Sequence, residues 1–391
     1  MKVKYIYTIF LFILLSGTTY AQIRIRIFAN QTPESAVFST DAGEYEINTF
    51  SGSFITVKQG DLVVISRFNN RIAVKIKGRE GIICDSVLFR GLTGKDLFRL
   101  RVNGESPLRK KYEGDLQIIP DFGTLMFINI SDIEAYIAGV VKAEGGSGRD
   151  PEYFRTQAVI ARTYLYRYIN KHAADHFNLC DNTHCQAFNG ITDDSLIIKA
   201  ALETRGEVIL GQDSLPIIAT FHSNCGGETA PSESVWVTPQ DYLKTVIDPY
   251  CLTSRNAKWR KTIALSDWID YLKRSGYMEN QADPQVFVFS QEHRKSDYRT
   301  GNFFMPLRLI RNDLSLRSTF FSVTVSGDSV ILDGRGYGHG VGLCQEGAMA
   351  MASKGFTYRQ IIGFYYTGVR IGTMLLSDFM NSSTNPTSLL K

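Results

Sequence analysis

Residues 131–144 read SDIEAYIAGVVKAE, and this stretch fixes how the larger, C-terminal part of the chain begins. Ser131 and Glu134 form a Ser-x-x-Glu capping box, which predicts that a helix begins there. The apolar residues recur at spacings of three and four and so share one stripe: Ile133, Tyr136, Ile137, Val140 and Val141. The pattern predicts an amphipathic helix that is buried along this stripe.

The next position on the stripe is Glu144, an acid where a leucine would be expected. A carboxylate at the mouth of an apolar face is partly desolvated, which raises its pKa and lets it hold a proton near neutral pH. Gly145, Gly146 and Gly148 follow at once, and glycines both end a helix and let a ligand approach the backbone. Glu144 is therefore the candidate general acid; the alternative is a solvated glutamate in the last helical turn.

The N-terminus predicts export. Residues 1–21 carry Lys2 and Lys4, a short apolar run and a small-residue cleavage site, which is typical of a secretory signal. The run is too short to span a membrane comfortably and no later stretch is apolar enough, so we expect a soluble protein that is periplasmic, extracellular or associated with the cell wall. Loss of the two signal lysines takes the net charge from +4 to +4 − 2 = +2, which argues against a nucleic-acid partner.

The sequence changes character near residue 110. Residues 22–110 contain short alternating segments such as IRIRIF at 23–28, which predict a small β-rich domain. Residues 111–375 mix helical and strand patterns, and residues 376–391 form a polar tail. We therefore expect an α+β protein, in which a mixed α/β catalytic domain follows a small, mostly β N-terminal domain.

A second helix is predicted where residues 151–172 read PEYFRTQAVIARTYLYRYINKH. Asp150 is suited to cap it and Pro151 to its first turn. Arg162 lies close to the packed face of this helix. It either orients Glu144 or contacts substrate, or it is an ordinary surface cation.

Residues 176–186, HFNLCDNTHCQ, place four metal-ligating side chains in ten positions. His176, Cys180, His184 and Cys185 include two thiols and two imidazoles, which suit a tetrahedral zinc site. A Cys180–Cys185 disulfide is the alternative in an oxidising compartment, and two free thiols are a third reading. Spacing alone fits metal and disulfide equally, and the clustering of both histidines with both cysteines favours metal.

Another cysteine pair follows downstream. Residues 221–227 read FHSNCGG, and Cys251 lies 26 positions after Cys225, which makes a disulfide between them a reasonable expectation. His222 and Ser223 are adjacent, so on a strand they point to opposite faces and do not form a nucleophile–base pair.

A glycine-rich segment, GRGYGHGVGLCQEG, occupies residues 334–347. It lacks the βαβ setting of a dinucleotide site, so no nucleotide cofactor is expected. The glycines instead allow a loop to pass close to a ligand and to present His339 and Gln345 for hydrogen bonding.

Five motifs occur in a fixed order between residues 112 and 373: IEAYIAGVVKAE, QAVIARTY, CDNTHCQAFNG, FHSNCGG and GRGYGHGVGLCQ. In these motifs the chain resembles the stage II sporulation protein D (SpoIID)/LytB amidase-enhancer domain family. The resemblance implies a peptidoglycan lytic transglycosylase that acts on glycan strands, with Glu144 as the essential acid. It also implies zinc near the CDxxHC segment in some members, with Cys180 and Cys185 as ligands and His184 and His176 nearby.

The implied reaction needs one carboxylate. A protonated Glu144 would protonate the glycosidic oxygen, and the resulting carboxylate would deprotonate the C6 hydroxyl of the same muramic acid to give a 1,6-anhydro end. Arg162, Ser223, His339 and Gln345 stand at family-like motif positions and are the candidate substrate contacts. Zinc would brace the loop beside the cleft.

The chain departs from the family pattern in two places. Many members follow the acid with Met-Pro, where this chain has Gly145 and Gly146, and the glycine motif usually continues with a serine and an aromatic residue, where this chain has Cys344 and Glu346. Two rival functions stay open at this point: a non-catalytic enhancer that binds cell-wall glycan or a partner amidase, and a zinc-dependent hydrolase of peptidoglycan.

Overall fold

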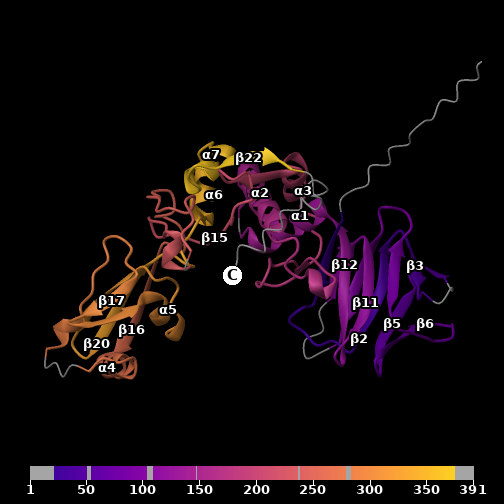
Figure 1. Ribbon diagram of the computed structural model, residues 1–391, viewed down its shortest axis with the longest axis horizontal. Coiled ribbons are helices and arrows are strands. Elements are labelled where there is room, and N and C mark those ends of the chain that lie inside the picture. Colours follow the sequence, from indigo (N-terminus) through magenta and orange to yellow (C-terminus); the bar gives the residue numbers. More distant parts are fainter. Residues whose placement is uncertain are drawn as a thin grey trace, which may run out of the picture.

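The computed structural model describes residues 22–50, 54–103, 109–146, 148–236, 238–278 and 283–374. Three regions follow one another along its length (Figure 1). A β-sandwich stands at one end, a helical region lies in the centre, and a smaller β unit forms the other end. The α+β class and the strand-rich N-terminal region are thus confirmed. The expected signal at residues 1–21 and tail at 376–391 lie outside the described residues.

The sandwich is built from two sheets. Its strands are β1 (Gln22–Ile27), β2 (Ser35–Ala42), β3 (Glu44–Asn48), β4 (Phe54–Lys58), β5 (Leu62–Phe68), β6 (Arg71–Ile76), β7 (Ile82–Cys84), β8 (Val87–Gly91), β9 (Leu97–Val102), β10 (Arg109–Glu113), β11 (Asp115–Asp121), β12 (Thr124–Asp132) and β13 (Leu179–Cys180). One sheet has the order β13-β1-β12-β11-β8-β3-β4 and the other β10-β9-β2-β5-β6-β7. The alternating sequence buries every second residue of β1, which lets the two sheets pack face to face.

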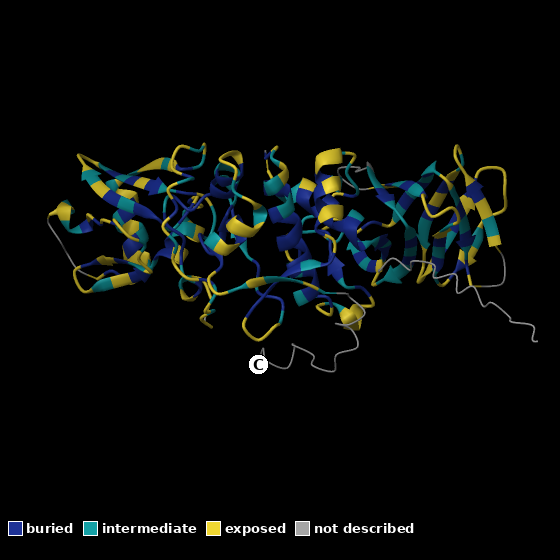
Figure 2. Ribbon diagram, turned by 90° about the horizontal axis from the view of Figure 1, so that it is seen from above, coloured by how far each residue is buried: buried dark blue, intermediate teal, exposed yellow. Residues whose placement is uncertain are grey.

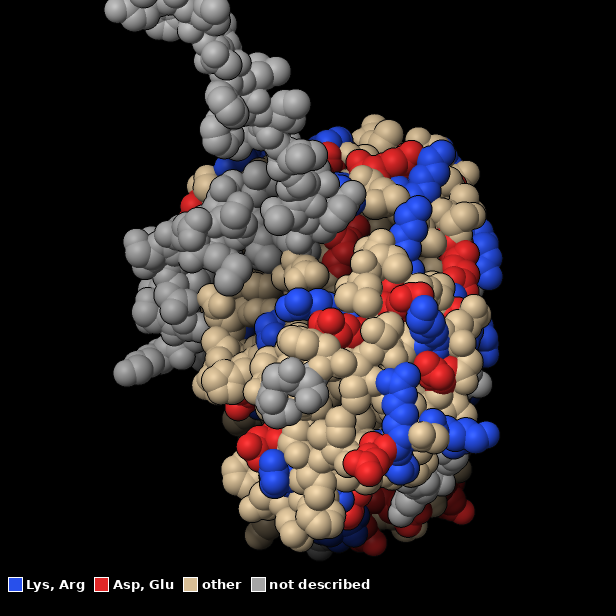
Figure 3. All heavy atoms as spheres, turned by 90° about the vertical axis from the view of Figure 1, so that its right-hand side faces the viewer, with Lys and Arg blue, Asp and Glu red and all other residues tan. Residues whose placement is uncertain are grey.

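Aromatic rings hold the sheets together. Phe38 of β2 lies 4.4 Å from Phe89 of β8, measured between ring centroids, and also contacts Tyr45 of β3. Figure 3 shows acidic and basic side chains interspersed over the face of the molecule at the sandwich end. Ion pairs within the sandwich include Arg99–Asp41. This mixed surface agrees with the modest net charge.

The sandwich crosses the domain boundary that the sequence suggests at residue 110. Strand β1 pairs antiparallel with β12 and parallel with β13, so the first strand of the described chain lies between two strands from beyond that boundary. The second pairing sets the position of Cys180, which is opposite Arg26.

The central region contains most of the helices. Its elements are α1 (Ile133–Glu144), α2 (Pro151–Arg167), η1 (Ala173–Asp175), α3 (Ser195–Glu203), β14 (Glu207–Leu210), β15 (Phe221–His222), η2 (Ser232–Ser234), β21 (Leu343–Cys344), α6 (Gln345–Ser353), α7 (Tyr358–Tyr365) and β22 (Arg370–Thr373). Buried residues are concentrated in its interior (Figure 2). Within the described chain, no helix is both long enough and apolar enough to cross a membrane.

Helix α1 buries the whole predicted apolar stripe. The capping box is wrong, however. The N-cap is Asp132, whose carboxylate accepts from the N–H groups of Glu134 and Ala135. Ser131 still belongs to β12, and the Glu134 side chain turns inward to Arg162 instead of back to the cap. Helix α2 begins as predicted, with Asp150 as its N-cap and Pro151 in its first turn.

A separate unit interrupts the C-terminal region. It contains β16 (Lys258–Ala264), α4 (Leu265–Arg274), η3 (Pro284–Phe287), β17 (Asp297–Thr300), β18 (Phe303–Pro306), α5 (Leu307–Asp313), β19 (Phe321–Ser326) and β20 (Ser329–Arg335). The unit has its own core around the fully buried Trp268. The sequence indicated one continuous mixed domain, whereas the structure has this second core between the DPYC segment (residues 248–251) and the glycine-rich segment.

Candidate active site and metal centre

Glu144 is the last residue of α1, and the end of this helix is held firmly. Gly145 forms the C-cap and donates its N–H to the carbonyl of Val141 at 2.7 Å. The carbonyl of Gly145 in turn accepts from the hydroxyl of the buried Tyr153, also at 2.7 Å. The two bonds satisfy backbone groups at the helix end and fix the direction in which Glu144 leaves it.

The Glu144 carboxylate has a single hydrogen-bond partner among the described residues. The N–H of Ala187 donates to Oε1 at 2.6 Å. Partial burial of the side chain raises its pKa above the ordinary value of 4.5, while the Ala187 N–H opposes this shift because it favours the charged form. Burial has the larger effect, so Glu144 is suited to hold a proton.

Gln345 connects the glycine-rich segment to α1. Its Nε2 donates to the carbonyl of Glu144 at 2.7 Å and to Oε1 of Gln157 at 3.4 Å. Nε2 of Gln157 is buried and has no hydrogen-bond partner in the part of the chain that the structure describes. Gln345 therefore positions the helix end through its N–H groups, which leaves its Oε1 as the atom that can contact a substrate.

The structure corrects the assignment of Arg162 as a substrate contact. The side chain is 0% exposed. Its five N–H donors are directed at acceptors within the protein: Nε at Glu134, one terminal nitrogen at Glu134 and the carbonyl of Ala201, and the other at Thr204 and the carbonyl of Glu207. No donor remains for a ligand, so Arg162 joins α1, α2, α3 and β14 instead.

Ser223 and His339 lie in the same region but do not contact the Glu144 carboxylate. The Ser223 carbonyl accepts from the N–H of Glu346, which follows Gln345, and its hydroxyl accepts from Asn256. Within the described chain, no hydrogen bond links either Ser223 or His339 to Glu144.

His339 is held as a neutral imidazole. Burial lowers its pKa to about 4. The N–H of Val341 donates to Nδ1 at 3.0 Å, which places the ring proton on Nε2, 3.4 Å from the hydroxyl of Thr220. The ring also lies 6.1 Å from the half-exposed indole of Trp236, measured between centroids. Sequence reasoning gave no role to Trp236, an aromatic face of the kind that packs against sugar rings.

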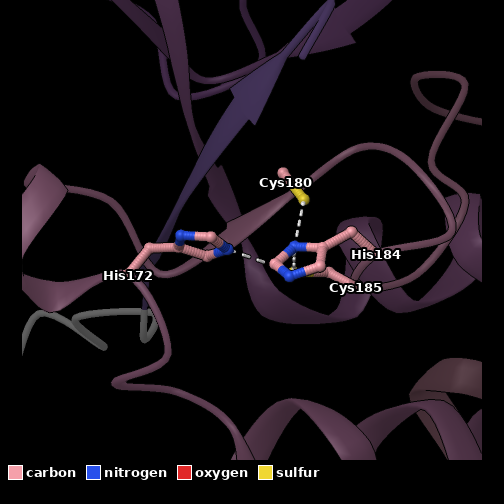
Figure 4. Close-up of side chains that lie close together, drawn as sticks. All are labelled: His172, Cys180, His184 and Cys185. Carbon is pink, nitrogen blue, oxygen red and sulfur yellow. Dashed lines mark hydrogen bonds between the residues drawn. The ribbon is translucent and has the colours of Figure 1, made fainter. Parts of the chain in front are cut away.

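A compact group of potential metal ligands forms beyond the end of α2 (Figure 4). The ligand atoms of His172, Cys180, His184 and Cys185 all lie within 4.8 Å of one another. All six cysteines of the chain are in its described part, and there none forms a disulfide. The sulfur of Cys180 lies 3.6 Å from Nδ1 of His184, and that of Cys185 lies 3.5 Å from Nε2 of His172 and 3.8 Å from Nδ1 of His184.

These distances fit a zinc ion. Zn–S bonds of about 2.3 Å and Zn–N bonds of about 2.0 Å place tetrahedral sulfur and nitrogen ligands about 3.5 Å apart. Nδ1 of His172 lies 3.4 Å from the carboxylate of Asp175, the arrangement that commonly orients a metal-binding imidazole.

His176 is not part of this group, although the sequence suggested it. Its backbone adopts a left-handed conformation with φ of 65°, and its side chain is exposed. The potential ligand in its place is His172, which the compact motif does not indicate because it precedes that motif and is brought back by the η1 turn. The sequence does contain a signal for this ligand, because His172 lies eight positions before Cys180, just past the end of a predicted helix.

The potential metal ligands and the Glu144 carboxylate belong to one local structure. Cys185 is two residues from Ala187, the donor to Glu144, and the carbonyl of Asn182 holds the N–H of Cys185 at 3.0 Å. Tyr136 of α1 donates to Oε1 of Gln186 between them. These contacts hold the loop of residues 180–187, called the ligand loop below, and so they also hold the Ala187 N–H in place.

Comparison with known proteins identifies relatives of this chain. The family described as Stage II sporulation protein, SpoIID, matches residues 122–210, which include α1, α2 and the ligand loop. Stage II sporulation protein D of Bacillus subtilis is 30% identical over 61% of this chain and 74% of its own length. This chain belongs to the SpoIID family.

Two further relatives extend the SpoIID match. An uncharacterized protein of Brachyspira hyodysenteriae is 28% identical over 89% of this chain and 95% of its own length, so this similarity extends well beyond residues 122–210. The amidase enhancer of Bacillus subtilis is 27% identical over 60% of this chain and 40% of its own length.

Proposed function

We propose that this SpoIID protein is an exported peptidoglycan lytic transglycosylase that cleaves glycan strands and leaves 1,6-anhydro-muramic acid ends. Membership in the family and the similarity to an amidase enhancer support a function related to the cell wall. The observation that carries the finer proposal is Glu144, a partly buried carboxylate held by one backbone N–H.

The surroundings of Glu144 suit a reaction with one carboxylate. Its pKa responds to burial and to the Ala187 N–H, with no contribution from a second acid in the described chain. Hydrolytic glycosidases of the common types need a second carboxylate at about 5–9.5 Å, either to act as nucleophile or to activate water. When the C6 hydroxyl of the same sugar attacks C1, neither a carboxylate nucleophile nor an activated water is needed.

In the proposed reaction, Glu144 gives its proton to the glycosidic oxygen as the C1–O bond breaks and positive charge develops at C1. The carboxylate then accepts the proton of the C6 hydroxyl while O6 bonds to C1 of the same muramic acid. The leaving strand gains one proton and the new end loses one, so water is not consumed. Because Ala187 occupies Oε1, we expect Oε2 to face the substrate.

His172, Cys180, His184 and Cys185 would hold zinc beside this site. With four protein ligands the ion would be structural and would stabilise the loop that carries Ala187. A full ligand set leaves no position for a metal-bound water, so the zinc-dependent hydrolase is not our proposal. The amidase-enhancer relative supports a second candidate, a protein that binds glycan or an amidase without cutting the strand.

The test is to incubate the mature protein and Glu144→Gln with peptidoglycan, both intact and stripped of stem peptides, and to analyse the products by mass spectrometry. The transglycosylase predicts anhydro-muramic ends from the wild type alone. No product on either substrate, with glycan binding retained, would leave the enhancer function.

A further inference from the structure

A second cluster of metal-ligating side chains lies inside the C-terminal region. It consists of Cys225, Asp248, Cys251 and Cys344, whose ligand atoms all lie within 4.8 Å of one another. Each of the four residues is 0% exposed. The sulfur of Cys225 is 3.3 Å from that of Cys251 and 3.2 Å from Oδ2 of Asp248.

Three separate segments supply these ligands. Cys225 belongs to the FHSNCGG motif, Asp248 and Cys251 flank a short turn, and Cys344 ends β21. Parallel pairing of β15 with β21 places His222 opposite Cys344 and so brings the first and third segments together. The sequence did not indicate that the three thiols lie together. It suggested a Cys225–Cys251 disulfide, and Cys344 was noted only as a departure from the family pattern.

The surroundings are arranged for negatively charged ligands. The sulfur of Cys344 is the N-cap of α6 and accepts from the N–H groups of Gly347 and Cys225, each at 3.3 Å. Backbone N–H groups at a helix N-terminus favour a thiolate. Asp248 accepts from the hydroxyl of Tyr365 at 2.9 Å and from the N–H of Tyr250 at 2.8 Å.

Among the described residues, no basic side chain bonds to the ligand atoms of the cluster, although the buried Arg294 is close enough to interact electrostatically with Cys225 and Cys344. Buried carboxylates and thiolates are unfavourable unless a positive charge compensates them. In the described part of the chain Asp248 takes part in no ion pair, and the nearby guanidinium of Arg294 donates to the carbonyls of Cys225 and Glu228 rather than to the ligand atoms. A bound metal ion would supply the missing charge.

We infer that Cys225, Cys251, Cys344 and Asp248 bind one zinc ion as a buried, structural site. Three sulfurs and one carboxylate oxygen form a four-ligand set that suits tetrahedral zinc, and complete burial leaves no open position for substrate. Zinc would separate the ligand atoms to about 3.6–3.8 Å, a few tenths of an ångström beyond the observed spacing.

The site would stabilise the proposed active site, although the inference goes beyond the proposed reaction and does not depend on it. Gln345 directly follows the ligand Cys344 and donates to the carbonyl of Glu144. Gly347 packs against Asp248 so closely that a Cβ there would lie 2.3 Å from Oδ2. Zinc would thus tie the start of α6 to the DPYC turn and hold Gln345 against α1.

The experiment measures zinc per chain by native mass spectrometry in the wild type, Cys344→Ser and Asp248→Asn, with folding checked by circular dichroism. Cys84→Ser is the matched control, because Cys84 is a buried cysteine far from both clusters in sequence and belongs to neither. We expect one zinc fewer per chain in Cys344→Ser and Asp248→Asn, and no change in Cys84→Ser. His172→Ala should lose a different zinc, so its loss should add to that of Cys344→Ser.

A wild-type zinc content in folded Cys344→Ser and Asp248→Asn would overturn the inference, as would a Cys225–Cys251 disulfide found by non-reducing peptide mapping. If those variants do not fold, His172→Ala is titrated with Co(II), since its second cluster is intact. We expect the charge-transfer absorption of three cobalt–thiolate bonds. A spectrum with fewer thiolates, or none, would contradict the site.

Discussion

The N–H of Ala187 lies 2.6 Å from Oε1 of Glu144, although 43 residues separate the two in sequence. This bond joins the end of α1 to the loop that carries the first ligand cluster. It occupies one carboxylate oxygen, and the other has no hydrogen-bond partner among the described residues. The Ala187 N–H therefore links the proposed general acid to the loop of the proposed zinc site.

The first prediction concerns the pH dependence of cleavage. Burial raises the pKa of Glu144 above 4.5, and the general acid must be protonated in the free enzyme. We expect kcat/KM to fall as pH rises through this raised pKa, so the alkaline limb should lie above pH 4.5. The measurement is the rate of anhydro-end formation against pH. A limb at or below 4.5 would contradict the assignment of Glu144.

The same shift predicts that Glu144→Gln stabilises the protein. The folded state binds the Glu144 proton more tightly than the unfolded state, so stability falls as pH rises from 4.5 through the folded-state pKa. Glutamine has no such titration and keeps an acceptor for Ala187. The variant should gain roughly 0.5–2 kcal/mol at neutral pH, which is the usual size of the gain from one stabilising substitution.

Thermal melts of the wild type and Glu144→Gln over a range of pH measure this difference. The melting temperatures should converge below pH 4.5, where both side chains are neutral, and separate as pH rises. A constant difference at all pH values would mean that packing, and not charge, distinguishes the two proteins.

A third prediction separates two nearby histidines. His172→Ala should greatly weaken zinc binding at the first cluster, because it removes one of four ligands. His176→Ala should leave it unchanged, because that side chain is exposed and outside the cluster. Competition with a chromophoric chelator measures both affinities. Equal losses in the two variants would show that the cluster is assigned incorrectly.

A fourth prediction tests the buried arginine. Arg162→Ala leaves Glu134 buried without its partner and should destabilise the fold by about 3–5 kcal/mol. The control is Arg260→Ala, which removes a solvent-exposed pair with Asp333 and should leave the free energy of unfolding almost unchanged. Urea unfolding measures both. Normal stability with weakened glycan binding in Arg162→Ala would restore its assignment as a substrate contact.

Local sequence patterns predicted the parts of this structure that depend on neighbours along the chain. The spacing of apolar residues gave α1 and the position of Glu144 on it, and Asp150 and Pro151 gave the start of α2. The capping box failed because Asp132 competes with Ser131 for the cap and because Glu134 has a stronger partner in Arg162.

Long-range contacts could not be read in this way. The pairing of β1 with β13, the return of His172 to the ligand loop and the meeting of three cysteine segments all depend on tertiary packing. In sequence Arg162 resembled a cation on a helix surface. Its hydrogen-bond acceptors come from α1, α3 and β14, which are distant in sequence, so the helix pattern alone could not show that it is buried. The second core around Trp268 likewise had no separate sequence signal.

The most direct test of the proposed reaction follows the fate of water. Peptidoglycan stripped of stem peptides is digested by the wild type in water enriched in oxygen-18, with Glu144→Gln as the inactive control. Intramolecular attack by O6 predicts anhydro-muramic ends that carry no label. Reducing ends labelled with oxygen-18 would show that water attacks C1, and would contradict a transglycosylase that works with Glu144 alone.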